Sequence, residues 1–339
     1  MRQVSWSHAL SALAIFGLLF CTSHVFGQTK PIELSYCHQY SATHAATTDL
    51  ADWAKEIEKR TNGRVKITMY PGNALADADK IYQSTVKGIL GIGSSTLGYN
   101  RGRFPIMEVI DLPLGYKSAM AATSLANEVY NKFKPKELDD TKIMYFFCHG
   151  PGFIHTKSPI NKLDDIKGMK IRCTGLSAKV VTALGGTPVA MPMPETYDAL
   201  SKGIVEGTVA PMEALKGWRL ADVIKFTNQN RGSAFTAAFF VAMNKDKWNS
   251  LPPDIQKTIE AVNSEWIPKS AAVWDNIDQG GTEATLAKGN KIITYSPEET
   301  DRWAKAVRPL LDEYVKDAGS KNLPGDAVLK FALERVKQL

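Results

Sequence analysis

Apolar and polar positions follow two spacings along the chain. Every second residue is apolar in Ile32–Cys37 and in Arg64–Tyr70, which predicts strands, whereas apolar residues recur every three to four positions in Ala45–Arg60, which predicts a helix. Asn62-Gly63 and Pro71-Gly72 mark the turns between them. This strand–helix alternation continues and predicts an α/β fold with parallel-rich sheets covered by helices. Further helices are expected at 76–87, 118–133, 176–184 and 195–202, and further strands at 89–94, 142–148, 169–173, 187–193 and 205–210.

Two later segments are long enough to pass from one domain to another. Ser233–Met243 is an apolar, aromatic run that predicts a long strand. Ile255–Ile277 keeps helical spacing over about 25 residues, or roughly 38 Å, and Pro268 should kink this helix. A capping box at Ser296–Glu299 opens a helix expected to reach about residue 317, and a last helix begins at Asp326. Because no flexible linker is visible, the chain is predicted to cross between its domains several times.

The N-terminus has the pattern of a secretory signal peptide. Arg2 gives a positive start, Ala9–Phe20 is apolar but too short to span a bilayer, and cleavage is expected after Gly27. Residues 28–339 would then work in the periplasm. At roughly 150 residues per domain, that length predicts two domains.

Charge and cysteine usage exclude several classes of function. The formal net charge of +6 is scattered among acidic residues, with no basic stripe that would indicate nucleic-acid binding. No CxxC or zinc spacing occurs, so neither a metal site nor a cofactor is predicted. Cys148 and Cys173 each end a predicted strand, and both a disulfide between them and two buried thiols remain open.

No motif of an enzyme is present. The glycine-rich stretch Gly88–Gly98 matches neither a dinucleotide-binding loop nor a phosphate-binding loop, and it is interpreted as a strand followed by a hydroxyl-rich loop. No GxSxG sequence or local cysteine nucleophile signature occurs either. The sequence therefore favours a binding protein over an enzyme.

Arg172 is the principal candidate for ligand binding. A short strand, Lys170–Cys173, delivers it to a turn that contains Gly175. A guanidinium group where a strand meets a loop can hold a carboxylate by two parallel hydrogen bonds. A surface salt bridge is the alternative interpretation of Arg172.

The surrounding motifs resemble the solute-binding subunits of TRAP transporters, the DctP-like family. The resemblance covers nearly all of 32–315, and its most specific part is the block 163–207. The motifs are LDDIKGMKIR at 163–172, ALGGTPV at 183–189, ETYDALSKGIVEG at 195–207 and YPGNAL at 70–75. The resemblance implies a two-lobed periplasmic-binding-protein fold with hinge strands and a long helix spanning both lobes. It further implies a monomer that closes around a small organic acid, pairs its carboxylate with Arg172 and delivers it to the small and large TRAP membrane subunits, which use an ion gradient.

The expected lobes are discontinuous in sequence. After the signal peptide at 1–27, lobe I is expected at 28–149 plus about 239–278, and lobe II at 150–238 plus about 279–339. Met193 stands where many relatives have an aromatic residue, and Ala210 stands where a polar one is common, although Glu213 follows shortly after it. No second arginine occurs near Gly152. These departures argue against sialic acid or a simple C4-dicarboxylate and leave a monocarboxylate, hydroxylated or aromatic, as the expected ligand.

Weaker pocket candidates lie at the ends of predicted strands, where core packing or loop solvation is the alternative reading of each residue. They are His38, Gln39, Tyr40, Ser95, Thr96, Phe153, Phe235 and Thr236, in addition to Met193 and Glu213. Two other functions stay open at this point. One is a sensor subunit that presents its ligand to a membrane receptor, and the other is a periplasmic enzyme on the same scaffold.

Overall fold

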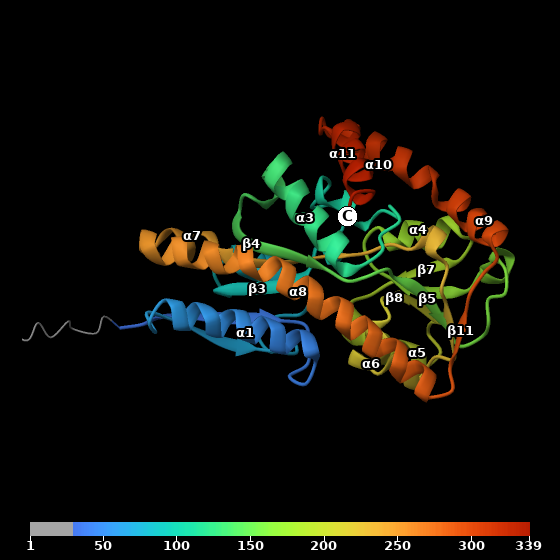
Figure 1. Ribbon diagram of the computed structural model, residues 1–339, viewed down its shortest axis with the longest axis horizontal. Coiled ribbons are helices and arrows are strands. Elements are labelled where there is room, and N and C mark those ends of the chain that lie inside the picture. Colours follow the sequence, from blue (N-terminus) through green and yellow to red (C-terminus); the bar gives the residue numbers. More distant parts are fainter. Residues whose placement is uncertain (1–29) are drawn as a thin grey trace, which may run out of the picture. The chain divides into compact units, whose positions relative to one another are not determined.

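The computed structural model describes residues 30–339, and residues 31–339 form one compact unit. The predicted signal peptide and its cleavage site after Gly27 lie outside the described residues. Within the described part, no helix is both long enough and apolar enough to cross a membrane. Two β-sheets, each with covering helices, make up this unit (Figure 1).

The first sheet has five strands in the order β2-β1-β3-β10-β4. Strand β10 runs antiparallel to both of its neighbours, whereas β1 pairs in parallel with β2 and with β3. The bounds are β1 (Ile32–His38), β2 (Val65–Tyr70), β3 (Ile92–Thr96), β4 (Thr141–Cys148) and β10 (Ala238–Asn244), and the helices packed near this sheet are α1 (Ala45–Arg60), α2 (Ile81–Val86), α3 (Ala119–Phe133) and α7 (Lys245–Asn249).

The second sheet has six strands in the order β11-β9-β5-β8-β6-β7. Here β5 is the antiparallel strand, and β6 pairs in parallel with both β7 and β8. The bounds are β5 (Phe153–Thr156), β6 (Lys170–Cys173), β7 (Thr187–Ala190), β8 (Gly207–Ala210), β9 (Phe226–Asn228) and β11 (Lys291–Ile293), with helices α4 (Ser177–Ala183), α5 (Thr196–Ser201) and α6 (Glu213–Gly217).

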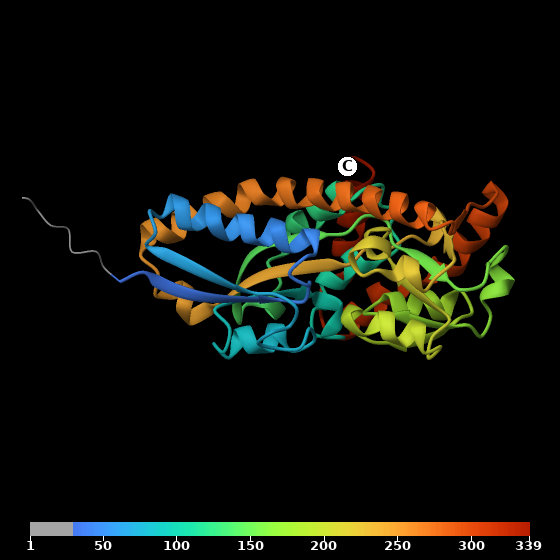
Figure 2. The ribbon, with the colours of Figure 1, turned by 90° about the horizontal axis from the view of Figure 1, so that it is seen from below.

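The chain passes between the two sheets at three places. Residues 149–152 carry it from β4 to β5, and residues 229–237 carry it back from β9 to β10. These two crossings are joined where the Gly152 N–H donates to the Phe235 carbonyl at 2.8 Å. The third crossing is α8 (Pro253–Ala287), which contacts α1 and α3 on one side and α6 and β11 on the other (Figure 2). The predicted two-lobed α/β fold with a long shared helix is confirmed.

Helix α8 is longer than its periodicity predicted. It runs for 35 residues, about 53 Å at 1.5 Å per residue, and it continues past Pro268 as one helix. The predicted helix 297–317 is instead two helices, because Pro309 lacks an N–H group and begins a new helix. The C-terminal elements are α9 (Pro297–Val307), α10 (Pro309–Ser320) and α11 (Gly325–Val336), of which α11 packs against α3.

Helix α1 is an example of how local sequence determines an element here. Leu50, Trp53 and Ile57 form its buried stripe, and the His44 side chain caps its N-terminus. Trp53 donates from its indole nitrogen to Asn263 of α8 at 3.0 Å. The stripe therefore seals the layer between the first sheet and α8, and the cap fixes the direction in which α1 leaves β1.

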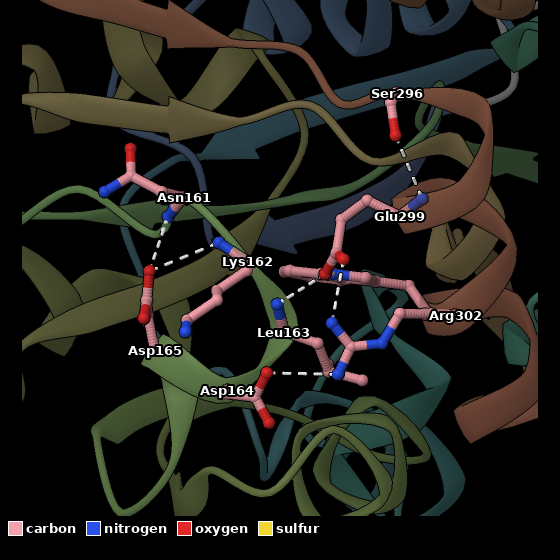
Figure 3. Close-up of polar contacts among 9 residues, drawn as sticks. Asn161, Lys162, Leu163, Asp164, Asp165, Ser296, Glu299 and Arg302 are labelled. Atoms are coloured by element: carbon pink, nitrogen blue, oxygen red, sulfur yellow. Dashed lines mark hydrogen bonds and ion pairs between the residues drawn. The ribbon is translucent and has the colours of Figure 1, made fainter.

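The segment that precedes the strand with Arg172 is held by the beginning of α9 (Figure 3). Glu299 accepts a hydrogen bond from the Leu163 N–H at 2.6 Å, and Arg302 pairs with Asp164 at 3.0 Å. Asp165 accepts from two backbone N–H groups just before it, at 2.9 and 3.2 Å. The acidic residues of this segment thus brace the entry to β6.

A candidate ligand-binding cavity

A cavity of about 40 Å³ is lined by residues from both sheets and from two helices. Thr96 and Phe239 come from the first sheet, Arg172 comes from the second, and Glu213 and Trp274 come from α6 and α8. An outer cavity of about 170 Å³ shares Tyr99 and Thr174 with it and extends to Arg101. Because parallel strands end at the same edge of a sheet, the loops after β1, β3 and β6 converge here.

Arg172 is a buried cation without an acidic partner. Its side chain is 2% exposed, and among the described residues no carboxylate lies within ion-pair distance of it. Nε donates to the Met191 carbonyl at 3.0 Å and Nη1 to the Val209 carbonyl at 3.3 Å. Burial lowers the pKa of the guanidinium, and the neighbouring Tyr99 counteracts that effect in part. Arginine nevertheless stays charged in proteins, so an incoming anion could pair with this buried charge.

The alternation of β6 explains why Arg172 faces the cavity. Ile171 and Cys173 lie on the opposite side of the strand, where they join a hydrophobic cluster with Val181 of α4. Because β6 is paired on both edges, its register fixes this direction. The two carbonyl groups that accept from Arg172 then set the direction of the guanidinium group.

Aromatic rings form much of the cavity wall. Phe239 and Trp274 stack with centroids 5.3 Å apart and an interplanar angle of 19°, and Phe147 stacks on Phe239 from behind at 5.0 Å. Such a wall is rigid and apolar, and it offers flat faces to a planar ligand. The six aromatic residues that line the cavity are Tyr40, Tyr99, Trp218, Phe235, Phe239 and Trp274.

His149 and Glu213 also belong to the cavity wall. Burial lowers the pKa of His149 to about 4, so its ring is neutral at neutral pH, and Nδ1 lies 2.5 Å from the Gly150 carbonyl. Glu213 is 3% exposed and lies 2.7 Å from His44 Nε2. Its backbone N–H donates to Asp278 of α8 at 2.8 Å. Burial raises the pKa of that aspartate to about 7.

Segments that follow strands of the two sheets also touch at the rim of the cavity. The Tyr99 hydroxyl accepts from the Met193 N–H at 3.0 Å. Next to it, Gly98 and Gly175 approach so closely that a Cβ on Gly175 would lie 2.9 Å from the Gly98 Cα atom. Asp111, whose pKa is raised to about 8 by burial, lies against both glycines. These contacts close the inner cavity on the side of the outer one.

The structure gathers seven of the predicted site residues around the cavity. They are Gln39, Tyr40, Thr96, Arg172, Met193, Glu213 and Phe235, and Ala210 lies with them. Four others do not line it. Ser95 is buried and donates to the Ala78 carbonyl at 2.7 Å, and Thr236 is buried and donates to the His149 carbonyl at 2.6 Å. Phe153 packs in a hydrophobic cluster, and His38 is buried behind Tyr40. Their roles in binding stay predictions.

The cavity also contains residues that the sequence did not single out. Tyr99, His149, Trp218, Phe239 and Trp274 belong to separate elements, and none carries a local motif. Trp274 could have been found as an aromatic residue on the helix that crosses both sheets. Cys37, Cys148 and Cys173 are free and buried, and the described residues contain no cluster of metal-binding side chains.

Two sheets joined by three chain crossings, with an unpaired arginine in a cavity lined from both, define a two-lobed solute-binding protein. The chain belongs to the bacterial extracellular solute-binding proteins, family 7, whose model matches residues 36–317. This family includes the periplasmic solute-binding subunits of TRAP transporters, and its members are binding proteins that work with membrane subunits.

Three similar proteins illustrate the family. The C4-dicarboxylate-binding periplasmic protein DctP of Rhodobacter capsulatus is 24% identical over 87% of this chain and 90% of its own length. A TRAP solute-binding protein of Rhodoferax ferrireducens, solved with copurified benzoate, is 27% identical with a TM-score of 0.86 and covers 91% of this chain and 98% of its own. A marine metagenome TRAP protein in complex with 3-hydroxybenzoate is 28% identical with a TM-score of 0.87 and covers 91% and 99%.

Proposed function

We propose that this protein captures an aromatic monocarboxylate between its two lobes and delivers it to a TRAP permease driven by an ion gradient. The observation that carries the proposal is Arg172, a buried charge without an acidic partner among the described residues. Leaving a charge buried and unpaired costs several kcal/mol, so a carboxylate that enters the cavity and pairs with Arg172 would offset this cost. Two parallel hydrogen bonds from the guanidinium would orient it.

The rest of the cavity supports a single carboxylate on an aromatic ring. Arg172 is the only arginine or lysine among its lining residues, and Glu213 would repel a second carboxylate. The stacked rings of Phe239 and Trp274 provide a flat apolar face. Structures with benzoate and with 3-hydroxybenzoate are among those that this chain resembles at 27% and 28% identity.

The size of the cavity supports a cycle of opening and closing. A volume of about 40 Å³ holds about three or four water molecules at roughly 10–15 Å³ each, which is less than an aromatic ring requires. The walls must therefore separate to admit the acid and close again around it. In the proposed division, lobe I consists of 28–149 and about 239–278, and lobe II of 150–238 and about 279–339.

A calorimetric screen of the purified protein tests this function. Benzoate, 3-hydroxybenzoate, succinate and glucuronate would each be titrated into the protein, with thermal unfolding measured in parallel. An aromatic monocarboxylate at 100 times its dissociation constant should stabilise the protein by about 2.7 kcal/mol, and succinate should not. Binding of succinate or glucuronate alone would contradict the assignment. Loss of uptake after deletion of this gene would test delivery to a permease.

A further inference from the structure

The cavity has a second polar region, apart from Arg172. Three lining residues contribute a buried polar atom that has no hydrogen-bond partner among the described residues, namely Gln39 Oε1, the Tyr40 hydroxyl and Trp274 Nε1. Glu213 adds a buried carboxylate, whose Oε1 lies 2.7 Å from His44 Nε2 and can accept a further hydrogen bond. All four residues are no more than 3% exposed. Buried polar atoms are nearly always paired, so three unpaired ones and a carboxylate in one wall indicate a ligand group that completes them.

The chemistry of these four atoms is mixed. An ionised Glu213 and the Gln39 carbonyl oxygen only accept hydrogen bonds, whereas Trp274 Nε1 only donates and the Tyr40 hydroxyl does either. A carboxylate here would face Glu213 with like charge, and an ammonium group could not accept from Trp274. A methyl group would leave the Gln39, Tyr40 and Trp274 atoms unpaired. A hydroxyl group both donates and accepts, and it is the simplest group that suits the set.

Glu213 is held in place for this role by its neighbours. His44 Nδ1 accepts from the Ala46 N–H at 3.1 Å, so the single proton of a neutral His44 lies on Nε2, which faces Glu213 Oε1 at 2.7 Å. Asp278 holds the Glu213 backbone N–H at 2.8 Å. A Cβ at position 217 would collide with both Glu213 and His44, so Gly217 leaves the space that the pair occupies. His44 is therefore a positioning residue.

We infer that the aromatic acid bound by this protein carries a ring hydroxyl, and that Glu213 is its main acceptor, with Gln39, Tyr40 and Trp274 around it. This inference rests on the proposed function and specifies its substrate class as hydroxylated aromatic monocarboxylates. Arg172 holds the carboxylate, and the second polar region selects among acids that Arg172 alone would bind equally. A hydrogen bond to a charged group gives about 10- to 150-fold discrimination.

The test compares ligands that differ only in this group. Benzoate, the three monohydroxybenzoates and the corresponding methylbenzoates would be titrated calorimetrically into the wild-type protein. The tightest-binding hydroxybenzoate should bind at least about 10-fold more tightly than benzoate, and at least about 10-fold more tightly than the methylbenzoate substituted at the same ring position. If benzoate or a methylbenzoate binds as tightly, the inference is overturned while the proposed function stands. If no aromatic acid binds, both are overturned.

Variants of the acceptor then assign the preference to a residue. Glu213→Leu should bring the ratio of hydroxybenzoate to benzoate affinity to about one or below, and Glu213→Gln, whose amide oxygen still accepts, should give an intermediate ratio. The free energy of unfolding in urea, measured on the ligand-free variants, serves as the folding control. His44→Asn keeps a good N-cap for α1 and should lower the same ratio. An unchanged ratio in Glu213→Leu would refute the inference.

Discussion

Replacing Arg172 with methionine should separate ligand binding from folding. The change removes the charge and keeps much of the side-chain volume. Truncating one partner of a buried, hydrogen-bonded charge pair costs about 2–5 kcal/mol. At about 1.4 kcal/mol per tenfold, the affinity for an aromatic acid should fall roughly 30- to 5,000-fold. Calorimetric titration of the wild-type and variant proteins with the tightest-binding acid of the screen measures this loss.

The stability of the ligand-free protein should respond much less. Arg172→Met leaves the Met191 and Val209 carbonyls without their donor, at about 1–3 kcal/mol each. It also removes an unpaired buried charge, which is worth several kcal/mol in the opposite direction. These effects oppose each other, so the free energy of unfolding should change by no more than about 2 kcal/mol. Urea unfolding of the ligand-free proteins gives this number.

Arg101 offers a matched control for charge. It is exposed, lines the outer cavity and makes no ion pair among the described residues. Arg101→Met changes the net charge by the same amount, and it should weaken binding by less than about 3-fold because solvent screens an exposed charge. If both variants lost affinity equally, or if Arg172→Met bound like wild type, the assignment of Arg172 as the carboxylate partner would be refuted.

Three further predictions follow from the rim and the core. Gly175→Ala should weaken ligand binding at least 10-fold, because its Cβ would press on Gly98. Gly168 has a similar positive φ but open space around it, so Gly168→Ala should lower stability without lowering affinity. Equal losses of affinity in the two variants, measured by calorimetry, would contradict this. Asp111 has a pKa of about 8 from burial, so the native form keeps a proton that the unfolded chain releases near pH 4. As the pH rises from 4 to 8, the free energy of unfolding of the wild type should therefore fall relative to that of Asp111→Asn, by up to about 1.4 kcal/mol per pH unit. Urea unfolding at pH 5 and 7 measures this difference, and the absence of such a trend would refute the prediction. The Cys148 thiol is buried with a raised pKa, so alkylation followed by mass spectrometry should modify it only after unfolding, and rapid reaction in the native protein would disprove its burial.

Local signals were sufficient for the long helices and for the strand that carries Arg172. Helix α1 has both a buried stripe and caps, and its bounds match the prediction. The short strands β5, β9 and β11 were not predicted, because three or four residues carry too little periodicity. Their partners lie far away in sequence, so the sheet itself supplies the information that makes them strands.

A site residue could be predicted from the sequence where it lies at the end of a single strand. It could not be predicted where the packing of the sheet decides which face the side chain points to. Ser95 and Thr96 are adjacent in β3, yet Thr96 lines the cavity and Ser95 bonds to the Ala78 carbonyl on the other face. Alternation along a strand states that neighbours point to opposite faces, but only the packed sheet determines which face the cavity uses. Trp274 was missed for a related reason, since nothing local indicates which side of a long helix meets the loops.

One turn of α8 connects the cavity to both lobes. Asp275 accepts from the Ala119 N–H at 2.6 Å, which holds the beginning of α3 beside the first sheet. Asp278, three residues on, holds the Glu213 N–H at the beginning of α6 beside the second sheet. Residues three apart lie on the same helix face, and Trp274 on this turn lines the cavity. A ligand that contacts Trp274 and Glu213 would therefore touch this turn of α8 and one of the two helices that it holds, so we expect binding and the angle between the lobes to be coupled through α8.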